Sequence, residues 1–344
     1  MAERVTIVGG GLAGLTLGIG LRQRGVPVTV WEAGHYPRHR VCGEFISGTG
    51  QRSLARLGLL DGIQKAGACV AQSVAFFAGE TRVPARSLPE AAVCVSRFVL
   101  DRWLADEFER LGGILRVGAR WSGEFGSGIV RASGRRVEPV AGGWRLFGLK
   151  FHARDVKLDA DLEMHFVPSG YVGLCRLAGG EVNICGLFRS EAAVPDLAQR
   201  WRHWLAGPPE STLHSRLAVA NVDEKSFCSI AGLCLQPQRA IQRTECRIGD
   251  ALTMIPPVTG NGMSMAFESA ELALEPLAKF SRGDLTWARA QEEIAWGCDH
   301  RFTSRLRWAA WLQRALFLPP ARGALLFLAT RSAWVSRVLF DRTR

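Results

Sequence analysis

A glycine-rich turn between two short apolar runs, within residues 5–32, restricts the fold of this chain more than any other feature. Val5–Val8 is a β-branched run, Gly9–Gly14 reads GGGLAG, and helical spacing follows as far as Arg24. A second run, Val28–Glu32, ends in an acid. Strand, glycine turn, helix and strand in this order, with an acid closing the second strand, are typical of a dinucleotide-binding unit.

The residues of this turn have separate tasks in such a unit. Gly9 permits the tight turn, Gly11 lets the backbone approach a pyrophosphate, and Gly14 allows the helix to pack closely on the strand. The N-terminus of the helix offers unpaired N–H groups and the positive end of a dipole to the phosphates. Glu32 is placed to accept hydrogen bonds from a ribose diol. We therefore expect a dinucleotide here, because a turn without a ligand does not require this spacing of helix and acid.

A second glycine-rich segment lies far downstream. A short strand ends at Gly249–Asp250, a loop rich in proline and glycine follows, and a helix is predicted from Met263 to Phe280. An aspartate at a strand end can bind a sugar-like hydroxyl, and the loop residues Gly260–Gly262 bring bare backbone N–H groups to the start of the helix. The segment is a second helix terminus suited to an anion.

Together the two segments resemble the FAD-binding domain of the p-hydroxybenzoate-hydroxylase-like flavoprotein superfamily, in particular its geranylgeranyl-reductase-like branch. Residues 36–47, YPRHRVCGEFIS, resemble the family segment that follows the acid-bearing strand, and residues 96–101, SRFVLD, resemble another. The resemblance implies that Asp250 holds the ribityl hydroxyls. It also implies that Gly260–Met263 meet the N1–C2=O edge of the flavin, where the helix dipole would favour an anionic reduced flavin.

The same resemblance implies that Arg38, Arg40, Cys42 and Gly43 lie near the flavin and its ribityl–phosphate arm, and that Arg97 approaches the cofactor. The residues expected to bind FAD are Gly9, Gly11, Leu12, Ala13, Gly14, Glu32, Arg40, Cys42, Gly43, Arg97, Asp250, Pro257, Gly260, Asn261, Gly262 and Met263.

No side chain is identified as catalytic, and the chemistry is expected at N5 of the flavin. Cys42 has two interpretations: a thiolate whose pKa is lowered by Arg38 and Arg40, or a small side chain packed beside the flavin. The second is favoured because neither a base nor a resolving cysteine lies close in the sequence. His152 and His165, on expected strands, are interpreted as packed or edge residues. The nine cysteines are dispersed without a C-x-x-C pair, so we expect reduced thiols and no metal site.

The predicted fold is α/β: a Rossmann-like FAD-binding domain, an inserted and mostly antiparallel β-sheet substrate domain, and a helical C-terminal tail. The FAD-binding domain is assigned to residues 1–70, 96–131 and 242–290, the substrate domain to 71–95 and 132–241, and the C-terminal helices to 291–344. Within the substrate domain, strands are expected at 144–150, 162–167, 170–175 and 181–187, and a helix at 194–205.

Three departures from the family patterns bear on the reaction. Aromatic hydroxylases of the superfamily carry an Asp-Gly motif used in FAD and NAD(P)H binding, and Ser133 stands where that aspartate would be. Flavin halogenases carry a Trp-x-Trp-x-Ile-Pro motif that the sequence lacks. Of the Tyr-x-Trp-x-Phe-Pro segment of geranylgeranyl reductases, Tyr171 alone remains. These departures disfavour a standard pyridine-nucleotide-driven hydroxylase and predict a substrate other than a geranylgeranyl lipid.

The net charge of +11 comes almost entirely from arginine, and no basic patch with interleaved aromatics lies outside the tail, so no nucleic-acid partner is expected. From Arg301 onward, nine arginines and one aspartate are mixed with Trp, Leu and Phe on both sides of Pro319 and Pro320. Amphipathic helices docked on the protein are favoured here. Peripheral membrane contact is the alternative. With no signal peptide and no run of about 18 apolar residues, we expect a cytoplasmic protein, or one on the inner face of the membrane.

Three functions remain open at this point. The first is an FAD-dependent oxidoreductase that reduces a carbon–carbon double bond of an apolar isoprenoid or polyketide-like substrate, with NAD(P)H or another external electron donor. The second is a flavin-dependent monooxygenase acting on an apolar or aromatic compound. The third is a non-catalytic lipid-binding protein on the same fold. The intact Glu32, Asp250 and Gly260–Gly262 argue against the third, since a carrier does not need them.

Overall fold

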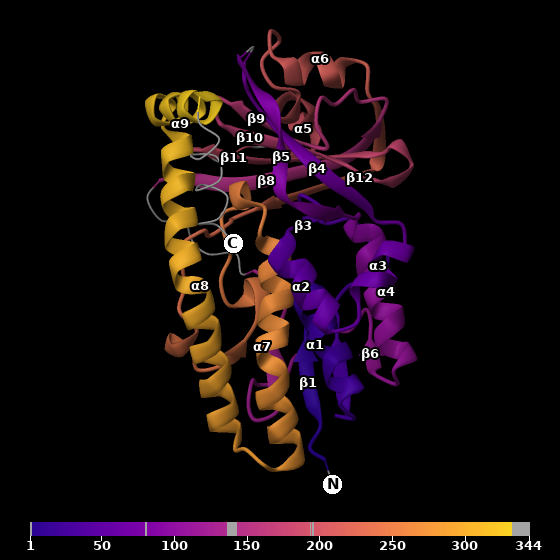
Figure 1. Ribbon diagram of the computed structural model, residues 1–344. Helices are drawn as coiled ribbons and strands as arrows, with labels where there is room; N and C mark the ends of the chain where they lie inside the picture. The colour runs from indigo at the N-terminus through magenta and orange to yellow at the C-terminus, as the bar shows by residue number, and fades with distance from the viewer. Residues whose placement is uncertain (1, 80, 136–142, 193, 195, 332–344) are drawn as a thin grey trace.

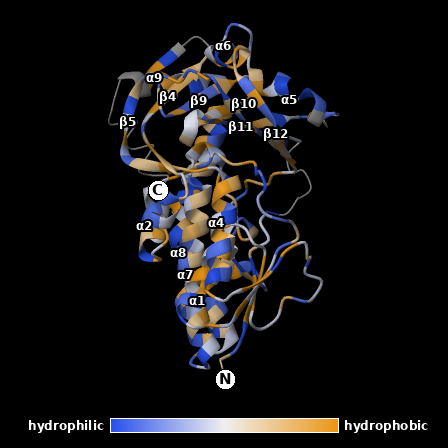
Figure 2. Cartoon of the chain, turned by 90° about the vertical axis from the view of Figure 1, so that its right-hand side faces the viewer, coloured by the Kyte–Doolittle hydropathy of each residue, from blue (hydrophilic) through white to orange (hydrophobic). Residues whose placement is uncertain are grey.

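The computed structural model describes residues 2–331, apart from 80, 136–142, 193 and 195. Its strands form two sheets, and the two views agree that the larger sheet lies at the end of the molecule opposite the N-terminus (Figures 1 and 2). The predicted α/β class, with a Rossmann-like part, a mostly antiparallel second sheet and C-terminal helices, is confirmed.

The smaller sheet has the strand order β13-β7-β1-β2-β6 and is parallel at every pairing. Its strands are β1 (Val5–Val8), β2 (Val28–Trp31), β6 (Ile114–Arg116), β7 (Ile129–Arg131) and β13 (Cys246–Arg247). Helices α1 (Leu12–Gln23) and α4 (Arg97–Arg110) pack on it, and α7 (Gly262–Arg282) packs on α1.

Helix α1 lies at the centre of this domain. Its sequence, LAGLTLGIGLRQ, is apolar on all sides, and the first ten residues are buried. A helix of this kind needs partners on every face, and α1 has them in β1 and β2, in α4 and in α7. Burial of α1 fixes its N-terminus at the carboxyl ends of β1 and β2, which is where nucleotides bind in parallel sheets.

The larger sheet has the order β12-β8-β11-β10-β9-β4-β5-β3 and is antiparallel except for the parallel pair β4–β9. Its strands are β3 (Phe45–Ile46), β4 (Cys69–Ala78), β5 (Thr81–Cys94), β8 (Arg145–Arg154), β9 (Leu162–Val167), β10 (Gly170–Arg176), β11 (Val182–Ser190) and β12 (Asn221–Ala231). β3 joins this sheet although it belongs, in sequence, to the segment that carries the nucleotide-binding unit.

The two faces of the larger sheet have different neighbours. On β8, Phe147 and Phe151 contact the tryptophans of α5 (Leu197–Ala206), and α6 (Thr212–Ala218) completes this layer. Because side chains alternate along a strand, Lys150 and His152 point to the opposite face, toward the nucleotide-binding domain.

The C-terminal helices cover part of that opposite face. α8 (Trp287–Phe317) runs beside α7, and α9 (Pro319–Arg331) turns over the end of the sheet (Figure 1). Leu312, Leu316 and Leu326 pack against the sheet residues Val83 and Phe166. Residues 287–331 therefore dock on the protein; the rest of the expected tail, 332–344, lies outside the described residues. None of the described helices combines the length and hydropathy that crossing a bilayer requires.

The remaining elements are short and lie on the flanks of the two sheets. They are α2 (Gly48–Arg56), α3 (Leu60–Lys65), and the 3₁₀ turns η1 (Ala178–Gly180), η2 (Ala240–Gln242), η3 (Gly249–Ala251) and η4 (Pro257–Thr259).

Candidate functional site

The glycine turn joins β1 to α1 with the geometry that the sequence predicts. Gly9 has φ of 116°, and a side chain on Gly14 would collide with the Gly9 carbonyl oxygen, so both positions require glycine. A methyl group on Gly11, by contrast, would meet nothing within 4 Å among the described atoms. Leu12 and Ala13 form the first turn of α1. The turn therefore leaves open space beside Gly11, at the positive end of a buried helix.

Glu32 already has protein partners. Its carboxylate accepts hydrogen bonds from the N–H groups of Gly10 at 2.9 Å and Gly34 at 2.7 Å, and Arg38 lies 2.7 Å away. Burial opposes its ionisation, but the Gly34 N–H and Arg38 outweigh that effect and hold the pKa of Glu32 below its usual value. The Tyr36 hydroxyl donates to the carbonyl of Gly10. Segment 36–38 thus lies across the nucleotide loop, and Arg38 pairs with the acid expected to bind ribose.

The downstream loop lies against the segment that contains Cys42. Pro257 begins η4, Gly260 has φ of 65°, and Gly262 and Met263 open α7. The Ser47 hydroxyl donates to Oδ1 of the fully buried Asn261 at 2.6 Å and lies 2.7 Å from the Ser264 hydroxyl. Ser47 therefore joins the two segments expected to contact the flavin. Ser47 and Asn261 are 214 residues apart in the sequence.

Four arginines converge between these segments. Arg40 lies near Arg38 and Arg97, and burial together with these like charges lowers the pKa of Arg40. The buried Nε groups of Arg40 and Arg135 have no hydrogen-bond partner in the described part of the chain. Unpartnered buried cations are costly, and a pyrophosphate would supply the missing acceptors. This excess of positive charge, next to the open helix terminus, fits the diphosphate of FAD. No sequence motif points to Arg135, which lies two residues after Ser133, the position of the aspartate in the Asp-Gly motif.

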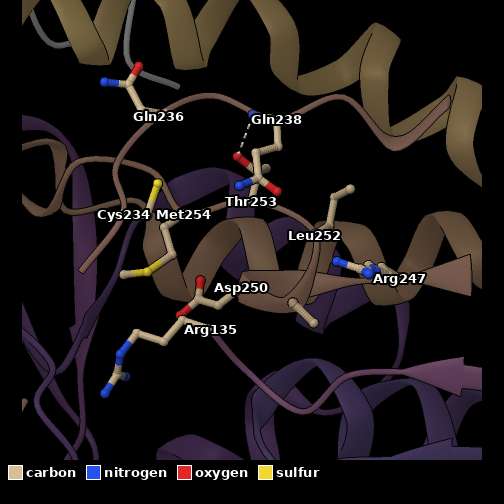
Figure 3. Close-up of a pocket in the computed structure, with 10 residues that line it drawn as sticks. Arg135, Cys234, Gln236, Gln238, Arg247, Asp250, Leu252, Thr253 and Met254 are labelled. Carbon is tan, nitrogen blue, oxygen red and sulfur yellow. Dashed lines mark hydrogen bonds between the residues drawn. The ribbon is translucent and has the colours of Figure 1, made fainter. Parts of the chain in front are cut away.

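Asp250 and Arg135 line one pocket, together with Met254 and Cys234 (Figure 3). Desolvation raises the pKa of the Asp250 carboxyl, while Arg97 and Arg135 act in the opposite direction. No protein group among the described residues donates a hydrogen bond to this carboxylate. It is therefore available to hydroxyl groups of a ligand, which is the role that the resemblance implies.

The cation that acts on Cys42 is Arg97, and not Arg38 or Arg40 as one interpretation expects. The guanidinium of Arg97 is held by the buried Asp101 at 2.6 and 2.9 Å. Burial raises the pKa of the Cys42 thiol despite Arg97. The neighbouring Gly43 faces the ring of Phe45. The arrangement supports the interpretation of Cys42 as a packed side chain, not a nucleophile.

A buried ionic cluster beside this segment was missed by sequence reasoning. Glu44 and Lys150 are fully buried, His152 is 1 % exposed, and His152 Nε2 lies 2.6 Å from the Glu44 carboxylate. His152, expected as a packed residue, thus belongs to an ionic cluster. His165, on the other face of the sheet, packs on Phe77 and contacts Glu163 at 2.9 Å. The sequence shows an acid, Glu44, directly after Cys42–Gly43, but nothing in the sequence indicates which residues contact it.

An apolar cluster adjoins the loop 257–263, which is expected at the flavin ring and is called the flavin loop below, on the side of α8. It contains Val258 of the loop and side chains from β4, β5, β9, β10, β11, α8 and α9. The Tyr171 hydroxyl donates to Oε1 of Gln313 at 3.0 Å, and the Val258 backbone also contacts it. Burial raises the pKa of Tyr171, so the phenol stays neutral. The cluster is a candidate substrate region because it joins an apolar surface to the loop expected at the flavin ring.

Comparison with known proteins supports an FAD-binding domain in the N-terminal part of the chain. The family described as FAD binding domain matches residues 3–125. These residues hold the glycine turn, Glu32, the Cys42 segment and Arg97. No curated protein matches the sequence.

Solved structures of low sequence identity share the fold. A PqsL variant from Pseudomonas aeruginosa has 16 % identity and a TM-score of 0.73, with 94 % of this chain and 100 % of that chain covered. Unmutated PqsL, described as a probable FAD-dependent monooxygenase, has 15 % identity and a TM-score of 0.71, with the same coverage.

Halogenases are similar to the same degree. The flavin-dependent brominase Bmp2 has 18 % identity and a TM-score of 0.73, with 99 % and 94 % of the two chains covered. The myxobacterial FAD-dependent halogenase CndH has 21 % identity and a TM-score of 0.69, with 85 % and 78 % covered. Identities this low establish the fold alone. Residues 3–125 therefore match an FAD-binding domain, and the chain shares its fold with these flavin-dependent proteins.

Proposed function

We propose that the chain is a flavin-dependent monooxygenase acting on a small apolar substrate. The observation that carries the proposal is the apolar cluster between the larger sheet and α8, which includes Val258 of the flavin loop. The FAD-binding domain and the fold shared with a probable monooxygenase support it. Bound FAD, once reduced by NAD(P)H or another external donor, would supply two electrons for the activation of oxygen.

The residues around the cluster have definable tasks in such an enzyme. Leu312, Leu316 and Phe317 would exclude water from the substrate region. Gln313 is buried, its Oε1 accepts from Tyr171, and its Nε2 has no partner among the described residues. We assign to this amide N–H the task of orienting an oxygen atom of an otherwise apolar substrate, because an unpaired buried donor favours a ligand that supplies an acceptor.

Reduction of a carbon–carbon double bond, as in the geranylgeranyl-reductase-like branch, is the second candidate. It is favoured by Ser133, which replaces the aspartate of the Asp-Gly motif. Residues Ala132 and Ser133 lie directly against Gly9 of the nucleotide turn, so the replacement falls within the cofactor site. In this case the same bound cofactor would deliver hydride to the substrate, and no oxygen would be consumed.

The first experiment is a visible spectrum of the purified protein with mass identification of the released cofactor. A yellow protein that releases FAD supports the enzyme. Apolar candidate substrates are then tested with reduced protein, under ¹⁸O₂ and without oxygen. Incorporation of ¹⁸O supports the monooxygenase, whereas a gain of two hydrogens without oxygen supports the reductase. A colourless protein that takes up no added FAD would instead indicate a lipid-binding protein.

We also propose peripheral membrane contact through the C-terminal helices if the substrate is lipid-like. The exposed apolar side chains Leu318, Phe327 and Leu328 on α9 and at its start support this proposal. Sedimentation with anionic lipid vesicles tests it, since a protein that stays in the supernatant at low salt contradicts it.

A further inference from the structure

A cluster of ionisable side chains is buried between the Cys42 segment and the larger sheet. We call it the Glu44 cluster, and its members are His39, Glu44, Lys150, His152 and Glu181. His152 Nε2 lies 2.6 Å from one Glu44 oxygen, and His152 Nδ1 lies 3.1 Å from Glu181. Lys150 Nζ lies 3.5 Å from the other Glu44 oxygen and 3.0 Å from His39 Nδ1. Neither the reaction proposed above nor any residue expected to bind FAD accounts for this cluster.

Glu44 has a backbone conformation that favours glycine. Its φ is 61°, and it is fully buried. A glutamate persists at such a position when its surroundings determine the conformation. Its carboxylate accepts from the Arg97 N–H at 2.9 Å, and its carbonyl accepts from the Val95 N–H at 3.0 Å. The side chain therefore links α4, β8 and the Cys42 segment at one point.

The same point is joined directly to Cys42. The Glu44 N–H donates to the Cys42 sulfur at 3.4 Å, and the fully buried Asn183 donates to the Cys42 carbonyl at 2.9 Å. Asn183 lies opposite His152 in the β8–β11 pairing. Movement of His152 or Glu44 would therefore be transmitted to the peptide groups of Cys42 and Gly43.

His152 faces a carboxylate from each ring nitrogen. A neutral imidazole has one N–H and one lone pair. It can donate to only one of the two carboxylates, and its lone pair would face the other and repel it. The imidazolium donates to both. Burial by itself would lower the pKa of His152, and Lys150 acts in the same direction, but Glu181 and Glu44 outweigh them and raise it. His39 is the neutral acceptor for Lys150, because burial and the charges of Lys150 and His152 lower its pKa to about 4.

We propose that Glu44 and His152 are positioning residues for the flavin. Imidazolium His152 fixes the Glu44 carboxylate, and Glu44 fixes the Cys42–Gly43 backbone in the conformation that receives the isoalloxazine ring. The proposal rests on the binding of FAD at this segment, and it is independent of whether the enzyme oxidises or reduces its substrate.

A direction of pH dependence follows. The folded-state pKa of His152 is raised above the value of 6.5 of a free histidine. The stabilisation of the folded Glu44 cluster by the His152 imidazolium is complete below pH 6.5. It is lost as the pH rises through the folded-state pKa of His152. Among the described residues, Asp223 on β12, Arg154 and Arg97 also act on the cluster. Four thiols near it, those of Cys42, Cys175, Cys185 and Cys228, have pKa values above the usual one, so they stay neutral across most of this range. FAD should therefore bind more weakly on the alkaline side.

The test is a fluorescence titration of FAD into the cofactor-free protein between pH 5.5 and 9. Wild type should lose FAD affinity as the pH rises through the folded-state pKa of His152, because the neutral ring no longer donates to both carboxylates. His152→Gln should bind FAD with the weak, alkaline-limit affinity of wild type at every pH in the range. His165→Gln is the matched control, because it removes another buried histidine–glutamate pair from the same sheet on the opposite face. It should keep the wild-type curve.

A second variant keeps the test decisive if His152→Gln fails to fold. Glu181→Gln removes the outer, partly exposed carboxylate and leaves Glu44 in place. It should move the inflection of FAD affinity toward acid, because Glu181 helps to raise the pKa of His152. The pH midpoint at which the ring NMR signals of His152 titrate in the cofactor-free protein should move in the same direction. An unchanged inflection in Glu181→Gln, or a wild-type pH profile in His152→Gln, overturns the proposal. Absence of FAD binding at every pH would instead reject the proposed function.

Discussion

Arg40 shows how a single side chain can be prepared for a ligand that is not part of the chain. Most arginines near it have carboxylate partners: Arg38 pairs with Glu32, and Arg97 pairs with Asp101. Arg40 is half-buried, near two like charges, and its Nε has no acceptor in the described structure. The fold tolerates this cost at a site where an anion can offset it.

Substitution of Arg40 should therefore reduce FAD affinity. Arg40→Met removes a charge-assisted hydrogen bond worth about 1.5–3 kcal/mol, so affinity should fall roughly 10- to 100-fold. The loss should shrink as salt is added, because screening weakens the wild-type interaction. Arg52→Met, which removes an exposed arginine paired with Glu90, is the matched control and should bind FAD like wild type. Equal affinity of Arg40→Met and wild type would remove Arg40 from the phosphate site.

At the scale of elements, two glycines of the nucleotide turn serve different purposes: one allows the helix to pack on the strand, and the other leaves space for a ligand. Gly14 serves the contact between α1 and β1, because its missing side chain makes room for the Gly9 carbonyl. Gly11 has no such neighbour, and the space beside it is open. One glycine thus stabilises the fold, and the other serves the ligand.

Alanine substitution at these two positions should give opposite results. Gly14→Ala inserts a methyl group into backbone and should lower the free energy of unfolding by about 1–3 kcal/mol. Gly11→Ala should change that free energy by less than about 1 kcal/mol but weaken FAD binding, because the methyl group enters the space for the pyrophosphate. Urea unfolding and FAD titration of both variants provide the measurement. Tight FAD binding by Gly11→Ala would place the pyrophosphate elsewhere.

At the scale of the whole molecule, α8 connects the nucleotide-binding domain to the larger sheet. Its first half packs on α7, and its last turns pack on the sheet through Leu312 and Leu316 (Figure 1). Because Val258 belongs to the same apolar cluster, the helix also supports the flavin loop. The C-terminal helices are therefore a structural part of the site.

Truncation of a buried leucine at this junction should destabilise the protein. Leu312→Ala removes a side chain that is 8 % exposed and should cost about 2–5 kcal/mol in urea unfolding. Leu318→Ala truncates the same residue type where it is 56 % exposed and should change stability by no more than about 0.5 kcal/mol. Similar stabilities of the two variants would show that α8 does not dock on the sheet as described.

The sequence by itself determined the nucleotide-binding unit, the second glycine-rich segment and four strands of the larger sheet, β8 to β11. These features depend on local requirements, such as a positive φ at Gly9 or the alternation of apolar and polar residues along β9. A few adjacent residues are enough to show such a requirement. Only the tertiary structure decided the pairing of β3 and the parallel contact of β4 with β9. It also decided the environments of Arg135 and Glu44. Glu44 and His152 are 108 residues apart, and no periodicity or motif in either segment specifies the other, because their contact depends on how the two domains pack.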